Sequence, residues 1–107
     1  FSVNLLHEKD GMAIARQVVM PADSRKIKGR TGDAANAVID KLAGLSYALH
    51  ENGCAVLDDA LGWFTCDAEG FHTTGDHTIV VGRVTDGDVV RPGEMLIERD
   101  LGWEYAG

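Results

Sequence analysis

The sequence is poor in features that mark several classes of protein. Its 107 residues include only two cysteines and two prolines, and aromatic residues make up 7%. Cys54 and Cys66 lack the CxxC spacing of zinc and redox motifs, and two thiols are too few for a disulfide framework. We therefore expect reduced, mostly buried thiols and, from them, a cytoplasmic protein.

Long apolar runs and long basic runs are also absent. No stretch approaches the roughly 18 apolar residues of a membrane-spanning helix. The longest basic run is the pair Arg25-Lys26 in a chain of formal net charge -7, which is too little to neutralise a nucleic-acid backbone. We expect neither a membrane nor a nucleic acid as partner, and an anionic cofactor would need local cations or backbone N–H donors.

The composition is that of a small globular domain. Apolar residues make up 45% and charged residues 25%, which is sufficient for a packed core. The length corresponds to one domain, residues 1–107. Because the chain opens directly on a strand-like segment at Phe1, we expect this domain to be truncated at its N-terminus.

The first half of the chain mixes one strand with helical periodicity. Residues 1–6 alternate as a half-buried strand does, and apolar residues then recur at helical spacing from Glu8 to about Met20, where Pro21 prevents continuation. The basic segment 21–33 has no periodicity and is expected to be a surface loop, which could reach the adenylate part of a dinucleotide by its charge. Helical spacing from Ala34 to Gly44 predicts a second helix.

The second half is typical of β-structure. Short runs rich in Val, Ile and aromatic residues are separated by three turn dipeptides, Asn52-Gly53, Asp86-Gly87 and Pro92-Gly93. The predicted strands are 46–50, 54–57, 60–68, 77–85 and 95–97. We expect a mainly β fold with two helices, in which the strand from His77 is apolar on both faces, lies centrally in a barrel and begins at its rim.

One stretch resembles a known family. In Cys66–Val84, a Gly75-Asp76-His77-Thr78 turn leads into an apolar strand ending Gly82-Arg83-Val84, as in the strand pair of flavin reductase-like domains. Further matches follow the order of the family at Phe1–Leu6, Asp40–Gly44, Leu57–Cys66 and Gly102–Tyr105. Together these matches cover nearly the whole chain.

The resemblance implies an antiparallel Greek-key FMN-binding split barrel that forms a homodimer. Such a protein binds FMN or FAD and reduces it with NADH or NADPH, and in many members the reduced flavin passes to a flavin-dependent monooxygenase. No catalytic triad is expected, because the hydride moves directly from nicotinamide to flavin. The main flavin motif of the family and its N-terminal strands are missing from this chain, so the chain alone is expected to be inactive.

The resemblance also suggests site residues. It places His77 at the rim of the flavin site as the catalytic contact to the nicotinamide or the flavin edge, and it implies cofactor binding by Asn4, Lys41, Gly75, Asp76 and His77. Structural interpretations compete with these roles. The His77 ring could bond Asp76 or a backbone carbonyl in a turn, Gly75 and Asp76 could form that turn, Asn4 could satisfy neighbouring strands, and Lys41 could be solvated.

Other functions stay open beside the reductase. The chain could belong to an oxidoreductase that retains its FMN, or to a non-catalytic split-barrel module for dimerisation or ligand binding. We expect no metal site, because the spacing of His50, His72, His77, Cys54 and Cys66 is unlike a compact zinc pattern.

Overall fold

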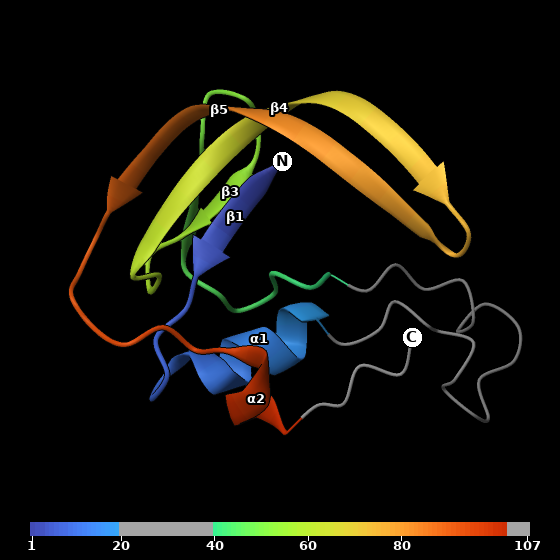
Figure 1. Cartoon of the computed structure of the whole chain (residues 1–107). Helices are drawn as coiled ribbons and strands as arrows, with labels where there is room; N and C mark the ends of the chain where they lie inside the picture. Colours follow the sequence, from blue (N-terminus) through green and yellow to red (C-terminus); the bar gives the residue numbers. More distant parts are fainter. Residues whose placement is uncertain (20–39, 103–107) are drawn as a thin grey trace, which may run out of the picture.

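The structure is a computed structural model that describes residues 1–19 and 40–102. Five strands and two helices follow one another along these residues (Figure 1). The strands are β1 (Ser2–Leu5), β2 (Tyr47–Leu49), β3 (Ala55–Leu57), β4 (Gly62–Thr74) and β5 (His77–Val89), and the helices are α1 (Gly11–Val19) and α2 (Glu98–Leu101). The fold class is therefore mainly β with two helices, as the sequence predicts, although α2 is not the second helix that was predicted from Ala34 to Gly44.

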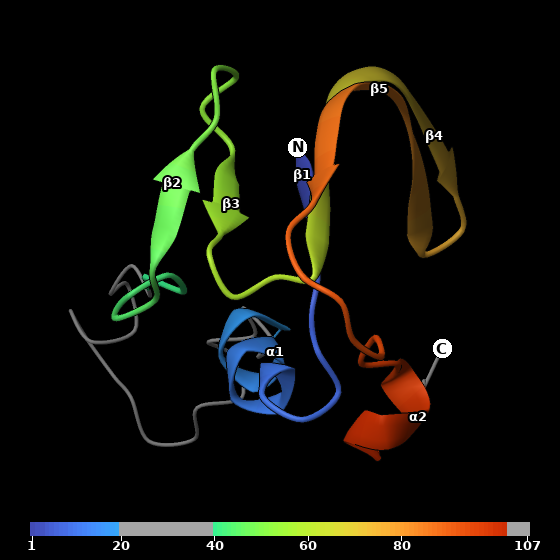
Figure 2. The ribbon, with the colours of Figure 1, turned by 90° about the vertical axis from the view of Figure 1, so that its left-hand side faces the viewer.

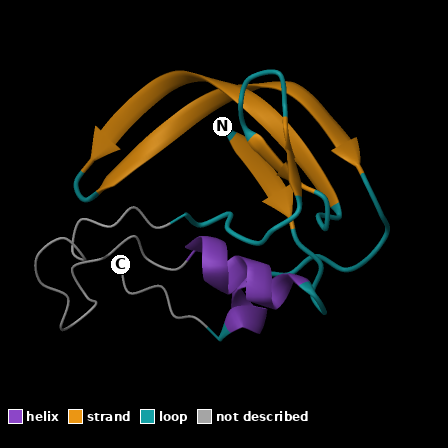
Figure 3. Ribbon diagram, turned by 180° about the vertical axis from the view of Figure 1, so that it is seen from behind, coloured by secondary structure: helices purple, strands orange, loops and turns teal. Residues whose placement is uncertain are grey.

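Two antiparallel sheets organise the strands. The larger sheet has the order β1-β4-β5, and the smaller is the hairpin of β2 and β3. Long strands β4 and β5 form an arch, and both helices lie below its concave side (Figures 1 and 3). Seen from the side, the β2–β3 hairpin and the far half of the β4–β5 ribbon lie on opposite sides of β1 (Figure 2).

The arch is bent by two irregularities in the ladder between β4 and β5. The register shifts between Thr65 and Cys66, and again between Ala68 and Gly70. Each shift leaves one strand with an extra residue, which bends the ribbon and increases its twist. The two 13-residue strands can therefore curve over the rest of the molecule rather than extend straight from it.

Side chains rather than a backbone ladder join β1 to β3. Asn4 donates from Nδ2 to the Ala55 carbonyl at 3.2 Å and accepts at Oδ1 from the Leu57 N–H at 2.8 Å. Ser2 donates to the same Ala55 carbonyl at 2.7 Å. The amide of Asn4 thus replaces the hydrogen bonds of a missing strand pairing and connects the two sheets.

The buried core is small and lies where β1, β3, α1 and the first residues of β4 meet. Its apolar members are Ala15, Leu57, Ala60, Leu61 and Cys66. Fully buried Thr65 keeps its hydroxyl within 3.1 Å of the Thr85 hydroxyl, so this polar group is satisfied inside.

An arginine fastens the loops around this core. Arg91 donates two hydrogen bonds to the Asp10 carboxylate, at 2.9 and 3.1 Å, and a third to the Asp59 carbonyl at 2.7 Å. The bidentate pair with Asp10 raises the pKa of the Arg91 guanidinium and lowers that of the Asp10 carboxyl. The loop after β5 is thereby tied to the start of α1 and to the loop before β4.

Most predicted elements are confirmed, but several predictions for the second half are wrong. The strand that begins at His77 lies at the edge of the described three-stranded sheet and not at its centre. Asp86 and Gly87 do not form a turn but lie within β5, opposite Thr65 and Phe64. Gly87 is needed there for close packing, since a Cβ atom would stand 2.9 Å from the Trp63 carbonyl oxygen. Segment 95–97 forms an isolated bridge from Met95 to His7 instead of a strand.

The predicted second helix and the basic loop can be compared only in part. Segment 21–33 and residues 34–39 lie outside the described residues. Residues 41–44 form turns, so the prediction of a helix as far as Gly44 is wrong at this end. Both cysteines are free thiols, with Cys66 buried and Cys54 half-buried. Within residues 1–19 and 40–102, no helix is long and apolar enough to cross a membrane.

Candidate functional site

The turn between β4 and β5 is built from Gly75 and Asp76. Thr74 pairs with His77 across it, so the connection has two residues. Gly75 has φ of 59°, in the region that favours glycine, whereas Asp76 does not have a positive φ. A glycine in this conformation at the first central position defines a type II′ turn, whose twist suits a hairpin. Gly75 therefore supplies the backbone conformation that places Asp76 directly before the first residue of β5.

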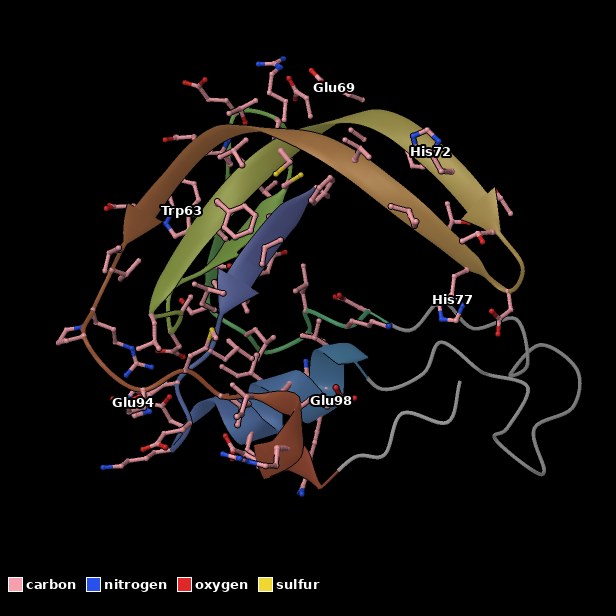
Figure 4. All side chains as sticks on the ribbon, viewed as in Figure 1. Trp63, Glu69, His72, His77, Glu94 and Glu98 are labelled. Carbon is pink, nitrogen blue, oxygen red and sulfur yellow. The ribbon has the colours of Figure 1, made fainter. Side chains whose placement is uncertain are left out.

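His77 and Asp76 contact each other at this turn. The Nδ1 atom of His77 lies 2.5 Å from Oδ1 of Asp76. Both side chains are accessible, with 53% of the His77 side chain and 74% of the Asp76 side chain exposed. Figure 4 shows His77 near the end of the arch, well away from Trp63 at the opposite end. The structure thus brings three of the predicted site residues, Gly75, Asp76 and His77, into one exposed turn.

An apolar hollow lies on the concave side of the same hairpin. It has a volume of about 460 Å³ and is lined by Phe1, Ala68, Phe71 and Val80. Phe71 pairs with Val80, so their side chains share one face of the ribbon. The Phe1 ring covers Gly82, where a Cβ atom would stand 2.6 Å from it. We call this surface the concave hollow.

The convex side of the hairpin carries charge. Arg83 donates from Nε to Glu69 at 2.7 Å and from Nη2 to Asp67 at 3.1 Å. The hydrogen bond to Glu69, with the charges of both carboxylates, raises the pKa of the Arg83 guanidinium. Glu69 and His72 project from this convex side in Figure 4. Arg83 is therefore engaged by two acids on the side opposite the concave hollow.

Asn4 and Lys41 lie apart from the turn. The Asn4 amide is bound to the backbone of β3, as described above. Lys41 lies in the turn that opens the second described range, where its carbonyl accepts from Gln17 Nε2 at 2.9 Å. In both Figures 1 and 2, β1 and this segment are separated from the end of the β4–β5 hairpin. The five predicted cofactor residues thus form one group of three and two isolated positions.

A second polar cluster was missed at the sequence level. His50 Nε2 lies 2.8 Å from Asp86 Oδ2, and the His50 ring packs at 5.4 Å from the Trp63 ring, measured between centroids. The hydrogen bond from His50 is the main cause that lowers the pKa of the Asp86 carboxyl, followed by the bond from the Gly87 N–H. The sequence did not indicate the His50–Asp86 contact, because the dipeptide Asp86-Gly87 is typical of a turn, whereas here it continues strand β5.

Metal-ligating residues are not grouped in the part of the chain that the structure describes. No set of three His, Cys, Asp or Glu side chains there could hold a metal ion. His50, His72 and His77, considered together at the sequence level, belong to different parts of the molecule: the end of β2, the convex face of β4 and the start of β5.

Comparison with known families agrees with this architecture. The family model described as "Flavin reductase like domain" matches residues 1–100. The chain belongs to this family. The match includes β1, the whole β4–β5 hairpin with its Gly75-Asp76-His77 turn, and most of the described chain.

Individual relatives support the same assignment. A flavin reductase from Pseudomonas putida is 38% identical over 58 residues, which are 54% of this chain and 34% of that protein. A protein named "Probable flavin reductase" from Rhizobium meliloti is 30% identical over 76 residues, 71% of this chain and 24% of its own length. This flavin reductase-like chain therefore spans about a quarter to a third of the length of these two relatives.

A solved structure shows the shared fold. Nitrilotriacetate monooxygenase component B from Mycobacterium thermoresistibile superposes with a TM-score of 0.61 at 26% identity, covering 84% of this chain and 41% of that protein. This chain therefore shares its fold with that protein over most of its length.

The described residues suit part of a nicotinamide or flavin. The His77–Asp76 turn offers polar atoms to the edge of a planar ring, and the concave hollow offers an apolar face. Phosphate groups need cations or free N–H donors, and on this hairpin Arg83 is already paired with two carboxylates. The fit is therefore to the ring end of such a ligand and not to its phosphates.

Proposed function

We propose that the chain is the nicotinamide-side part of an NAD(P)H-dependent flavin reductase that supplies reduced FMN or FAD. In this proposal, residues 1–107 are one truncated domain, completed by N-terminal strands that carry the main flavin motif. The observation that carries the proposal is the family match over residues 1–100, which includes the exposed Gly75-Asp76-His77 turn. The relatives named as flavin reductases support the same activity.

Each predicted site residue has its own role in this proposal. When bound, the nicotinamide supplies a hydride to the flavin, so the protein must bind and orient the two rings rather than move protons. His77 contacts the ring edge, Asp76 and Gly75 hold His77 in place, and Asn4 and Lys41 contact the flavin from the completed barrel. Asn4 could reach a flavin through the N–H that its bond to the Ala55 carbonyl leaves available, or through the second lone pair of its oxygen, since Leu57 uses only one.

A homodimer is part of the proposal. Both faces of the hairpin are exposed in the single chain, including Phe71 on the concave side and Ile79 and Val81 on the convex side. An isolated two-stranded ribbon is marginally stable in water, so apolar residues on both its faces favour covering partners. We propose that N-terminal strands cover the concave face and a second copy the convex one.

A partner monooxygenase completes the proposed reaction. Nitrilotriacetate monooxygenase component B and a stachydrine N-demethylase reductase subunit are both similar to this chain. Their names describe one component of a monooxygenase and the reductase subunit of a demethylase. We propose by this similarity that the reduced flavin is handed to a flavin-dependent monooxygenase in the cytoplasm.

The test uses the full-length protein and follows flavin absorbance without oxygen. Mixing with FMN or FAD and with NADH or NADPH is expected to bleach the flavin, and His77→Ala is expected to lower kcat/KM about tenfold, the effect of one lost hydrogen bond. His72→Ala, on the same hairpin, is the matched control and should retain activity. Unchanged flavin absorbance with both nucleotides would overturn the proposal, and flavin that stays bound through gel filtration would indicate the flavin-retaining oxidoreductase instead.

A further inference from the structure

We propose that Asn52 is a site of covalent modification in the folded protein, where its side-chain amide is converted to a carboxylate through a cyclic imide formed with Gly53. The dipeptide Asn52-Gly53 lies in the loop of residues 50–54 that joins β2 to β3. Both residues are exposed at the tip of this loop. The proposal concerns the chemistry of the loop and does not depend on the proposed reductase function.

The reaction needs only these two residues and water. The backbone nitrogen of Gly53 bonds to Cγ of Asn52, the bond from Cγ to Nδ2 breaks, and Nδ2 leaves as ammonia with the proton of the Gly53 N–H. Water then opens the five-membered imide at either of its carbonyl groups. The product is an aspartate or an isoaspartate, and in both cases the chain gains one negative charge.

The conformation of the loop brings the reacting groups together. The Oδ1 atom of Asn52 accepts from the Cys54 N–H at 3.0 Å, so the side chain turns along the chain toward the backbone of Gly53. Negative charge develops on Oδ1 as the Gly53 nitrogen attacks, and a backbone N–H that already donates to this oxygen stabilises such an oxyanion. The contact with Cys54 therefore both aligns the amide and polarises its carbonyl group.

Gly53 is well suited to be the attacking residue. Its φ is 78°, in the region that favours glycine, and no atom beyond its chain neighbours lies within 4 Å of the position of a Cβ atom. Without a side chain, Gly53 leaves its nitrogen accessible to the Asn52 amide. One contact opposes the reaction, because the Gly53 N–H donates to the His50 carbonyl at 2.8 Å. A single hydrogen bond on an exposed loop should slow the reaction by roughly tenfold and not prevent it.

Asn4 is the contrasting asparagine among the described residues. It is followed by Leu5, whose side chain hinders attack by the backbone nitrogen. The Asn4 amide is also held at both ends by β3, with Nδ2 donating to the Ala55 carbonyl and Oδ1 accepting from the Leu57 N–H. These bonds would have to break before the imide could form, so we expect Asn52 to react at least about tenfold faster than Asn4.

The new charge would enter acidic surroundings. A cavity of about 380 Å³ beside Asn52 is also lined by three acidic residues, Glu51, Asp67 and Asp86. A fourth carboxylate adds repulsion between like charges, which salt screens. Asn52→Asp, which imitates the aspartate product, should therefore lower the Tm of the full-length protein by roughly 1 to 2 °C at low salt and by less at high salt. An unchanged Tm at low salt would contradict this consequence.

The direct test is peptide mass spectrometry of the full-length protein after several days in warm, mildly alkaline buffer. Digestion with pepsin at acid pH limits further reaction during preparation. The peptide that contains Asn52 is expected to gain about 1 Da, from replacement of NH₂ by OH, whereas the peptide that contains Asn4 should stay largely unchanged. In guanidinium chloride the rate at Asn52 should rise by about tenfold at most, because the bond to His50 is lost.

Asn52→Ser is the matched control, because a serine hydroxyl can also accept from the Cys54 N–H but offers no amide carbon to attack. Ion-exchange chromatography should show an acidic species that accumulates in wild type and much more slowly in Asn52→Ser. If Asn52 stays intact in the folded protein, or reacts only in guanidinium chloride, the proposal is wrong. Equal accumulation of the acidic species in Asn52→Ser would assign the modification to another residue and would also overturn it.

Discussion

Two regions of the molecule differ in how they are held together. The base consists of α1, β1, β3 and residues 62–66 of β4, and the hairpin arm consists of residues 67–84. In the base, Leu57 is 6% exposed and Thr65 is fully buried, whereas in the arm Phe71 is 67% exposed and Val80 is 45% exposed. The base is stabilised by packing, and the arm mainly by the ladder between its two strands.

The difference shows that polar side chains have different uses in the packed base and in the exposed arm. Polar groups of the base, such as Asn4 and Thr65, are used internally, to join β1 to β3 and β4 to β5. Polar groups of the arm, His77 and Asp76, face solvent at its end. A packed scaffold that carries an exposed polar turn is a common division in proteins.

The largest expected effect compares the two regions directly. Leu57→Ala should lower the free energy of unfolding by about 3 kcal/mol, because it leaves a cavity in the base. Val80→Ala in the arm should cost below about 1 kcal/mol, because the side chain is half solvated. Urea unfolding of the 107-residue chain checks both values.

The same pair of variants in the full-length protein sharpens the comparison. If N-terminal strands cover the concave hollow there, Val80→Ala should become more costly, while the effect of Leu57→Ala should stay the same. Equal costs for the two variants in the 107-residue chain would show that the arm is already buried in solution, which would contradict the division between base and arm.

A smaller effect on stability is expected where the side chain of Asn4 joins β1 to β3. Asn4→Ala removes two hydrogen bonds and leaves the Leu57 N–H without its partner, which should cost about 2 kcal/mol. Ser2→Ala is the matched control, since the Ala55 carbonyl would still accept from Asn4, and it should cost below about 1 kcal/mol. Thermal unfolding without any flavin measures the structural effect alone. If Asn4→Ala does not change the stability, the contact between β1 and β3 does not depend on this amide.

The base was largely predictable from sequence patterns. Strand β1, helix α1 and strand β3 lie within the ranges that periodicity and turn dipeptides indicate, as does β2 outside the base. Alternation predicted β4 only to residue 68, because the register shift between Ala68 and Gly70 breaks the period of two, and the strand in fact continues to Thr74.

Residues 86 and 87, just beyond the arm on β5, show the limits of local patterns. Asp86-Gly87 has turn chemistry, but tertiary packing against Phe64 and the Trp63 carbonyl uses the missing side chain of Gly87 instead. The turn at Gly75 was predicted, as was the position of His77 at its edge. The bond of His50 to Asp86 joins residues 36 positions apart, and no local pattern carries that information.

The smallest expected effect concerns this His50–Asp86 pair, which ties the end of β2 to β5. The hydrogen bond from His50 lowers the pKa of Asp86 below its ordinary value of 3.8. A carboxyl whose pKa is lower in the folded state stabilises the fold above its unfolded pKa, and this stabilisation is lost as the pH falls through the folded value. Asp86→Asn should therefore lower Tm at pH 7 by roughly 2 °C or less, since the pair is partly solvated. The difference from wild type should shrink as the pH falls below about 4.

In a His50→Gln background, the contribution of Asp86 to this pH dependence should be smaller than in wild type, although the bond from the Gly87 N–H would retain part of it. An identical pH dependence with and without His50 would show that the Gly87 N–H alone lowers the pKa of Asp86, and β5 would then gain nothing from its contact with the end of β2.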